Sequence, residues 1–169
     1  MPYNLPYNTA LFREHCEVNL YICSLTRLKL HSVMRMPAFL KQSYACIKQA
    51  RQANGLIYGA TIFEPLTIFS TVTIWETMRD MQRYIATGAH RQAMPQLRVW
   101  CSDAVTTHFE WQDTKAPSWD ECLLTLKSGR FVPVLNPSKY HATGELVPKR
   151  RAFPSEFFLT SGESHVRGR

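Results

Sequence analysis

The chain has 169 residues, a length that fits one domain with an appendage and is too short for two domains with separate cores. Because 45% of its residues are apolar and 20% are charged, it can bury a core, which excludes wholesale disorder. Its longest apolar runs fall far below the roughly 20 residues of a membrane-spanning helix, and its N-terminus has no basic segment followed by an apolar one, so we expect a cytoplasmic protein without a transmembrane segment.

The first half of the chain alternates between strand and helix patterns. Residues 1–17 combine prolines and asparagines without periodicity, which predicts an irregular arm. The segment 18–31 is rich in β-branched and aromatic residues and predicts a long strand. Apolar residues at helical spacing predict a helix over 37–54, which Asn-Gly ends. Two further strands are predicted at 56–63 and 67–75, joined by a short turn as a hairpin.

The second half continues with helices, one more strand and a tail. A second helix is predicted from 78 to the glycine at 88, and a third from about 90 to 104, with a break expected near Met94 because a proline follows it. The segment 105–111 predicts the fourth strand. A capped short helix is predicted at 117–126.

The predicted tail, 127–169, is dense in proline and glycine and carries most of the net positive charge. It holds eight Lys and Arg against three Asp and Glu, whereas residues 1–126 hold 12 against 10, and the whole chain has a net charge of +7. Such a tail could dock on nucleic acid or on an anionic membrane. Its only contiguous basic run, 149–151, is short, which favours a solvated loop-rich tail and argues against nucleic acid as a partner.

The cysteines give no sign of a disulfide framework or a zinc knuckle. There are five of them, an odd number, and they are scattered without a close pair. This usage suits a reducing cytoplasm.

The predicted order of elements is βαββαβ, the ferredoxin-like α+β plan, over residues 18–126. Helices would cover only one face of the sheet, so the other face needs cover. Two sheets packed face to face in an isologous pair would supply it. The topology therefore predicts a homodimer.

Strand alternation indicates which side chains face a pocket. On 18–31, Arg27, Lys29 and His31 fall on the predicted open face, opposite the helices, where a dimer would form a cavity. A solvated strand end explains them equally well. On 105–111, His108 and Glu110 share a face and could add a titratable pair to that cavity, or form a cross-strand polar pair at the surface.

The candidate site residues are densest between Trp75 and Met94. His90 and Met94 are four residues apart, so on a continuous helix they share a face and could ligate a metal or haem iron. The alternative is structural, since a histidine near a helix end often caps carbonyls and methionines fill core gaps. Nucleotide-binding, serine-hydrolase and zinc-protease motifs are absent, as is the aromatic signature of RNA-binding split βαβ sheets.

Three segments carry a resemblance to a known family: 71–76 (TVTIWE), 81–84 (MQRY) and 87–94 (TGAHRQAM). They resemble spheroidene monooxygenase-like proteins, which belong with the dimeric α+β barrel proteins that also include the antibiotic-biosynthesis-type monooxygenases. The resemblance covers roughly residues 20–119. It implies a ferredoxin-like homodimer whose pocket, between sheet and helices, accepts an apolar or aromatic substrate, or haem, and supports oxygenation.

The resemblance also implies roles for individual residues. Met94 stands where the haem-degrading relatives have their proximal histidine, and His90 lies one helical turn earlier, which makes His90 the expected metal ligand of a haem. Trp75, Tyr84 and Met94 would line the slot for the macrocycle. Relatives without a cofactor oxygenate electron-rich phenols with the substrate's own reducing power, and there His108 with Arg27 would orient a phenolate.

Three functional hypotheses follow. The first is a monooxygenase of this superfamily, with or without haem. The second is a non-catalytic dimeric protein of the same fold that binds a small molecule or haem, and the third is an interaction protein that uses its basic tail.

Overall fold

The structure, a computed structural model, describes residues 19–65, 67–149 and 153–159. Across these residues the centre of the fold is a six-stranded sheet, ordered β5-β4-β1-β3-β2-β6, in which every neighbouring pair is antiparallel. The strands are β1 (Tyr21–Leu30), β2 (Leu56–Glu64), β3 (Ile68–Trp75), β4 (Cys101–Trp111), β5 (Arg130–Phe131) and β6 (Phe153–Leu159).

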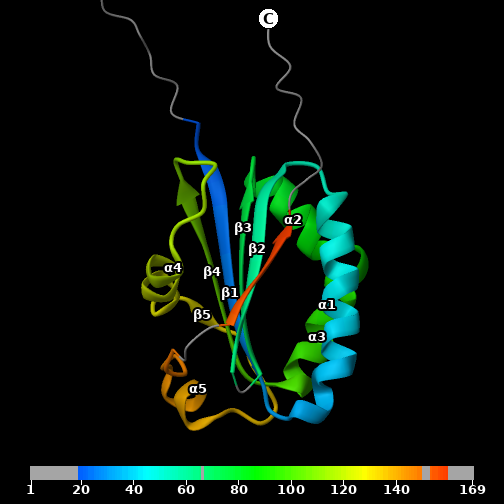
Figure 1. Ribbon diagram of the computed structural model, residues 1–169, viewed down its shortest axis with the longest axis vertical. Helices are drawn as coiled ribbons and strands as arrows, with labels where there is room; N and C mark the ends of the chain where they lie inside the picture. Colours follow the sequence, from blue (N-terminus) through cyan, green and yellow to red (C-terminus); the bar gives the residue numbers. More distant parts are fainter. Residues whose placement is uncertain (1–18, 66, 150–152, 160–169) are drawn as a thin grey trace, which may run out of the picture.

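Helices α1, α2 and α3 cover one face of this sheet, on the right in Figure 1. The helices are α1 (Met36–Arg51), which follows a 3-10 turn at Val33–Arg35, α2 (Met78–Ala86), α3 (Gly88–Trp100), α4 (Trp119–Leu126) and α5 (Lys139–Thr143). The run β1-α1-β2-β3-α2-α3-β4 is the ferredoxin-like βαββαβ plan with its second helix divided in two. The predicted fold class is confirmed.

The second helix is divided at Gly88 as expected, but the further break expected in α3 does not occur. α3 continues through Pro95, so the break expected near Met94 is wrong. The chain turns between α2 and α3 at Thr87, which is extended, and at Gly88, whose φ is +54°. A proline costs a helix one hydrogen bond, and burial of Ala93 and Trp100 against the rest of the fold offsets that loss.

The second face of the sheet is covered by the chain itself, which corrects the expectation of an open face. Cys122 and Leu126 of α4 pack with Cys23 and Leu25 of β1 in one buried cluster. A capping box between Ser118 and Glu121 begins α4, and α4 and α5 lie on the left in Figure 1. The homodimer stays a prediction, but an uncovered sheet face no longer argues for it.

The predicted tail contributes more than loops. β5 pairs with β4 at one edge of the sheet and β6 pairs with β2 at the other. The division into an arm (1–17), a domain (18–126) and a tail (127–169) remains a prediction, and the arm lies outside the described residues. None of the described helices has the length and apolar character needed to cross a bilayer.

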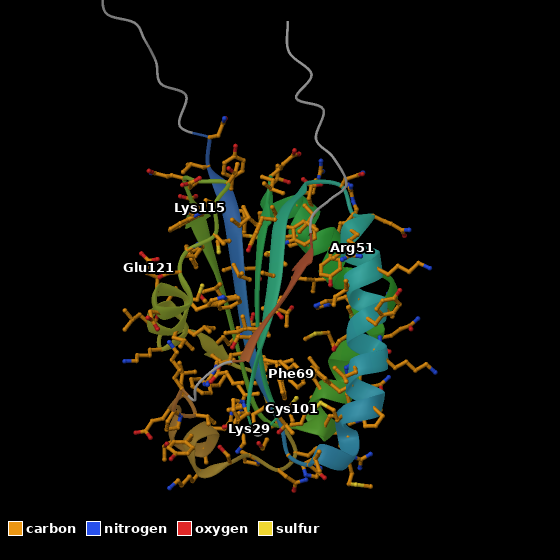
Figure 2. The ribbon with its side chains drawn as sticks, viewed as in Figure 1. Lys29, Arg51, Phe69, Cys101, Lys115 and Glu121 are labelled. Atoms are coloured by element: carbon orange, nitrogen blue, oxygen red, sulfur yellow. The ribbon has the colours of Figure 1, made fainter. Side chains whose placement is uncertain are left out.

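Side chains fill the layer between the sheet and helices α1 to α3 at both ends, as Figure 2 shows. At one end Leu30, Phe39 and Trp100 form a buried cluster, and at the other end Trp75 and Met81 form another. Each large apolar side chain buried in this way contributes roughly 1.5–3 kcal/mol to stability. Between the two clusters the layer is not filled, and a cavity remains.

Candidate functional site

A cavity of about 980 Å³ lies between the sheet and helices α1, α2 and α3. Small-molecule sites usually measure about 300–1,000 Å³, so this one can hold a ligand of several fused rings. Seven Phe, Tyr and Trp side chains line it: Phe39, Tyr44, Phe63, Phe69, Trp75, Tyr84 and Trp100. The cavity is thus suited to a large apolar or aromatic molecule.

The sheet side of the cavity is polar because hydroxyl side chains alternate along the strands. We call this set the hydroxyl floor: Ser24, Thr26, Thr61, Thr71, Thr73 and Thr106. Several of these hydroxyls already contact each other, with 3.2 Å between the Oγ1 atoms of Thr26 and Thr106. The helix side is mainly apolar, with Ile47, Leu97 and Met94 among its residues. A flat ligand would therefore meet hydroxyls on one face and hydrocarbon on the other.

Trp75, Tyr84 and His90 form a row of rings along the cavity wall. The ring centroids of Trp75 and Tyr84 are 5.1 Å apart, and those of Tyr84 and His90 are 4.8 Å apart. Trp75 donates its indole N–H to Thr73 and Tyr84 donates its hydroxyl to the carbonyl of Cys46 at 3.3 Å. Because hydrogen bonds hold the first two rings in place, the row presents a rigid aromatic surface.

Gln49 of α1 holds the turn that carries His90. Its Oε1 accepts the backbone N–H of His90 at 2.9 Å, and its Nε2 donates to the carbonyls of Tyr84 and Thr87 at 3.1 Å each. A Cβ at Gly88 would lie 2.8 Å from that Oε1, and its positive φ also favours glycine. The Gly-Ala-His segment is therefore explained by the close approach of Gln49.

Burial sets the chemistry of His90. Desolvation lowers the pKa of its imidazole, and a backbone contact with Ile85 opposes this only in part. The ring is thus neutral at physiological pH, and its Nδ1 is buried without a hydrogen-bond partner among the described residues. A neutral imidazole beside an apolar cavity can accept a proton from a ligand or coordinate a metal.

The predicted cofactor-binding residues lie together. Trp75, Tyr84, His90 and Met94 all line this cavity, with Met94 one turn after His90 on α3. His108 lines it as well, from an exposed position on β4. The structure therefore places five of the six predicted site residues around one space.

Arg27 lies on the other face of the sheet and does not reach His108. It is only 4% exposed, and its Nη2 and Nε donate to the two carboxylate oxygens of Glu64 at 2.9 and 3.1 Å. Its Nη1 donates to the carbonyl of Val147 at 2.6 Å. The expected placement of Arg27 in a cavity with His108 is wrong, because β1 sends consecutive side chains to opposite faces and His108 pairs with Ser24.

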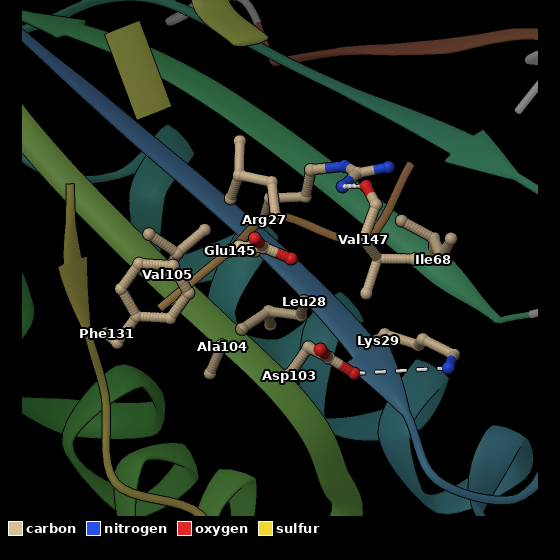
Figure 3. A pocket seen from close by; sticks show the side chains of 11 residues that line it. Arg27, Leu28, Lys29, Ile68, Asp103, Ala104, Val105, Phe131, Glu145 and Val147 are labelled. Carbon is tan, nitrogen blue, oxygen red and sulfur yellow. Dashed lines mark hydrogen bonds and ion pairs between the residues drawn. The ribbon is translucent and has the colours of Figure 1, made fainter. Parts of the chain in front are cut away.

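Figure 3 shows the space around Arg27, which measures about 10 Å³. That volume admits about one water molecule. Lys29, on the same strand face, pairs with Asp103 at 4.0 Å. His31 follows the end of β1 and is exposed, and Glu110 is exposed on β4. Around Arg27 the second sheet face thus holds a buried ion pair and a space too small for a substrate.

Haem is the cofactor that the resemblance implies, and the residues fit it in part. A haem site needs one axial donor and an apolar slot. His90 is a neutral imidazole on the wall of an aromatic-lined cavity, with Met94 four residues on. Throughout the described ranges no group of three or more His, Cys, Asp or Glu could hold a metal ion by itself. A haem needs only one donor from the protein, and within the described part of the chain His90 is placed to supply it.

Sequence reasoning missed three features of the site. The hydroxyl floor follows from period-2 alternation, since Thr71 and Thr73 share the parity of Trp75 on one strand, so a signal existed. The role of Gln49 had no signal in the sequence, because its hydrogen-bond partners lie 35 to 41 residues away along the chain. Glu64 was assigned to a turn, yet it ends β2 and is the buried partner of Arg27.

Comparisons with known proteins address the fold. No protein-family model and no curated protein matches this sequence. Among solved structures, a protein of unknown function from Nitrosomonas europaea is similar with a TM-score of 0.50 at 12% identity, over 60% of this chain and 98% of that one. This likeness shows a shared fold and nothing about activity.

Two further structures are less similar. SnoaB, a cofactor-independent oxygenase from Streptomyces nogalater, has a TM-score of 0.45 at 11% identity, over 57% of this chain and 95% of that one. A provisionally assigned antibiotic biosynthesis monooxygenase from Nitrosomonas europaea has a TM-score of 0.45 at 12% identity, over 60% of this chain and 97% of that one.

Proposed function

We propose that the protein is a monooxygenase that binds an apolar or aromatic small molecule in the cavity beneath α1 and α3. The cavity is the observation that carries the proposal: its size, its seven Phe, Tyr and Trp side chains and the buried neutral imidazole of His90 fit a polycyclic ligand with a few polar substituents. The oxygenase class comes from the sequence resemblance over 71–94, and the fold is compatible with it.

A cofactor-free reaction needs a substrate that supplies its own electrons. An activated methylene compound does so, because its methylene group and one dioxygen molecule give a ketone and one water molecule, with every atom and electron accounted for. His90 would take the methylene proton, the carbanion would add oxygen to give a hydroperoxide, and loss of water would leave the ketone. The ring row of Trp75 and Tyr84 would hold the planar substrate, and the hydroxyl floor would bind its polar substituents.

Oxygen uptake tests this proposal. Anthrone serves as the probe because it is tricyclic and has an activated methylene, and its spontaneous oxidation is subtracted. The wild type should accelerate uptake, and ¹⁸O-labelled dioxygen should place one labelled atom in the new ketone. His90→Gln should reduce the rate by about 10²–10⁴-fold, the usual contribution of a general base. His31→Gln, an exposed histidine outside the cavity, is the matched control.

Haem binding is the second candidate, and the unpartnered Nδ1 of His90 favours it. His90 would be the axial donor, while Trp75, Tyr84 and Met94 would contact the macrocycle, and the bound haem would supply redox chemistry with oxygen. Titration with haemin should then give a Soret band that His90→Ala weakens. If haemin binds but oxygen uptake stays at the background rate, the protein is a haem-binding protein without oxygenase activity. If haemin does not bind and anthrone causes no oxygen uptake above the background rate, both proposals fail.

A further inference from the structure

Two of the three helices that cover the cavity, α1 and α3, carry basic residues and no acidic ones. Residues 31–51 and 88–100 contain no Asp or Glu. They contain six basic residues: Arg35, Lys41, Lys48, Arg51, Arg91 and Arg98. α1 and α3 lie side by side, so these charges belong to one layer of the molecule. Figure 2 shows Arg51 on this side, opposite Glu121 and Lys115.

Large apolar side chains are exposed in the same layer. Met34 is 82% exposed and Tyr44 is 68% exposed. Half of the large hydrophobic side chains that are exposed within the described ranges fall in the single segment 33–44: Val33, Met34, Leu40 and Tyr44. Exposed apolar residues that gather in this way mark an interaction site.

The order of residues on α1 mixes the two kinds of side chain. Pro37, Lys41, Tyr44 and Lys48 are all exposed and follow each other at spacings of four, three and four, so they form one stripe along the helix. Tyrosine and lysine both place an apolar body beside a polar tip. Such a stripe, preceded by the exposed Met34, has the composition of a helix that lies in a membrane interface.

We propose that this face, the exposed side of 33–48 together with the basic residues of α3, docks on an anionic lipid bilayer. Cations beside an anionic leaflet gain electrostatic energy, and apolar side chains gain by entering the headgroup region. The positive charge of this face favours an anionic bilayer over the other partners that could cover it. A second copy of this chain would bring two cationic layers together, and nucleic acid would leave Val33 and Met34 in water.

The docking face also borders the cavity. Leu40 and Tyr44 are both exposed and both line the cavity, so they connect its wall with the docking face. An apolar ligand dissolved in lipid could enter there without crossing water. This connection rests on the proposed function, whereas docking itself requires no turnover.

Co-sedimentation with vesicles tests the proposal in the full-length protein. The vesicles contain either phosphatidylcholine alone or phosphatidylcholine with phosphatidylglycerol at a ratio of 7:3. One variant, Lys41→Gln/Lys48→Gln, removes charge from the stripe, and another, Val33→Ser/Met34→Ser, removes apolar surface. The matched control, Lys115→Gln/Lys127→Gln, removes the same charge from exposed positions at the two ends of the segment that carries α4. The basic C-terminal residues stay in every variant.

The wild type should bind the anionic vesicles and not the neutral ones. Each basic residue near an anionic surface contributes roughly a fivefold factor, so the stripe variant should bind on the order of twentyfold more weakly than the control. The serine variant should also lose affinity.

Three results would overturn the proposal. The first is that the wild type does not bind the anionic vesicles. The second is that the stripe variant and the control lose equal affinity for these vesicles. The third is that the stripe variant loses affinity while the serine variant does not. The second would assign binding to net charge or the tail, and the third to a polyanion such as nucleic acid. Oxygen uptake is measured separately with a water-dispersed probe, so failure of docking and failure of the proposed function remain distinguishable.

Discussion

Replacement of Arg27 separates a structural role from a catalytic one. Arg27→Met leaves Glu64, which is 1% exposed, without its two-point cationic contact, and leaves the Val147 carbonyl without this donor. Removing one partner of a buried ion pair typically costs about 3–5 kcal/mol. A domain of this size has a total stability of about 5–15 kcal/mol, so the loss is large but the fold should survive. Arg27→Lys, which keeps the charge and loses the fork geometry, should cost less.

Urea unfolding followed by circular dichroism measures the change in the free energy of unfolding. The double variant Arg27→Met/Glu64→Leu should recover much of the loss, because it also removes the buried carboxylate that has lost its contact with Arg27. Binding of ligands in the large cavity should be unchanged, since Arg27 lies on the opposite face of the sheet. If Arg27→Met kept full stability but abolished ligand binding, the assignment of this residue to a structural ion pair would be refuted.

Three further predictions concern titration, thiols and a helix cap. Burial lowers the pKa of the His90 imidazole from 6.5. The stabilisation that comes from the neutral ring is therefore complete above pH 6.5 and is lost as the pH falls through the lowered pKa. In urea titrations at pH 4 to 8, His90→Gln should make the free energy of unfolding fall less steeply as the pH is lowered. Burial raises the pKa of Cys23 to about 12 and that of Cys122 to about 11. In a Cys16→Ser background, mass spectrometry should therefore find both thiols unlabelled by maleimide at pH 7 until urea is added. Rapid labelling of the folded protein would contradict the burial of these two thiols. Ser118→Ala removes the cap of α4 and should cost about 1 kcal/mol in thermal unfolding, whereas no change would contradict the capping box.

The sequence predicts the ferredoxin-like plan because its signals are local. Alternation in β1 and β3 and helical spacing in α1 depend on residues within one element, and the structure agrees with them. On β1, Ser24 and Thr26 alternate with Arg27 and line the cavity on the other face of the sheet, as the two-residue period of a strand requires.

The errors arise where long-range contacts decide. Pro95 is tolerated in α3 because packing outweighs one lost hydrogen bond. The cover of the second face comes from α4 and from the segment near Val147, whose apolar residues are too sparse to predict a docked structure. Arg27 could not be assigned without Glu64, because 37 residues separate the two in sequence.

The same distinction applies to the site. Trp75, Tyr84, His90 and Met94 share a short stretch of chain, and their common location could be predicted from spacing. The sheet side of the cavity could not be predicted in this way, because it depends on the register that pairs β1 with β4 and β3.

The central claim is that the large cavity binds an apolar aromatic molecule, and calorimetric titration with 1-naphthol tests it most directly. Ala93 is buried on α3 and lines the cavity, so Ala93→Phe fills part of it, whereas Leu124→Phe changes an exposed position on α4 and serves as the control. The account predicts binding of one equivalent to the wild type and the control with a negative heat-capacity change, and binding at least roughly tenfold weaker to Ala93→Phe. Equal affinity in all three proteins, or no binding to the wild type, would contradict it.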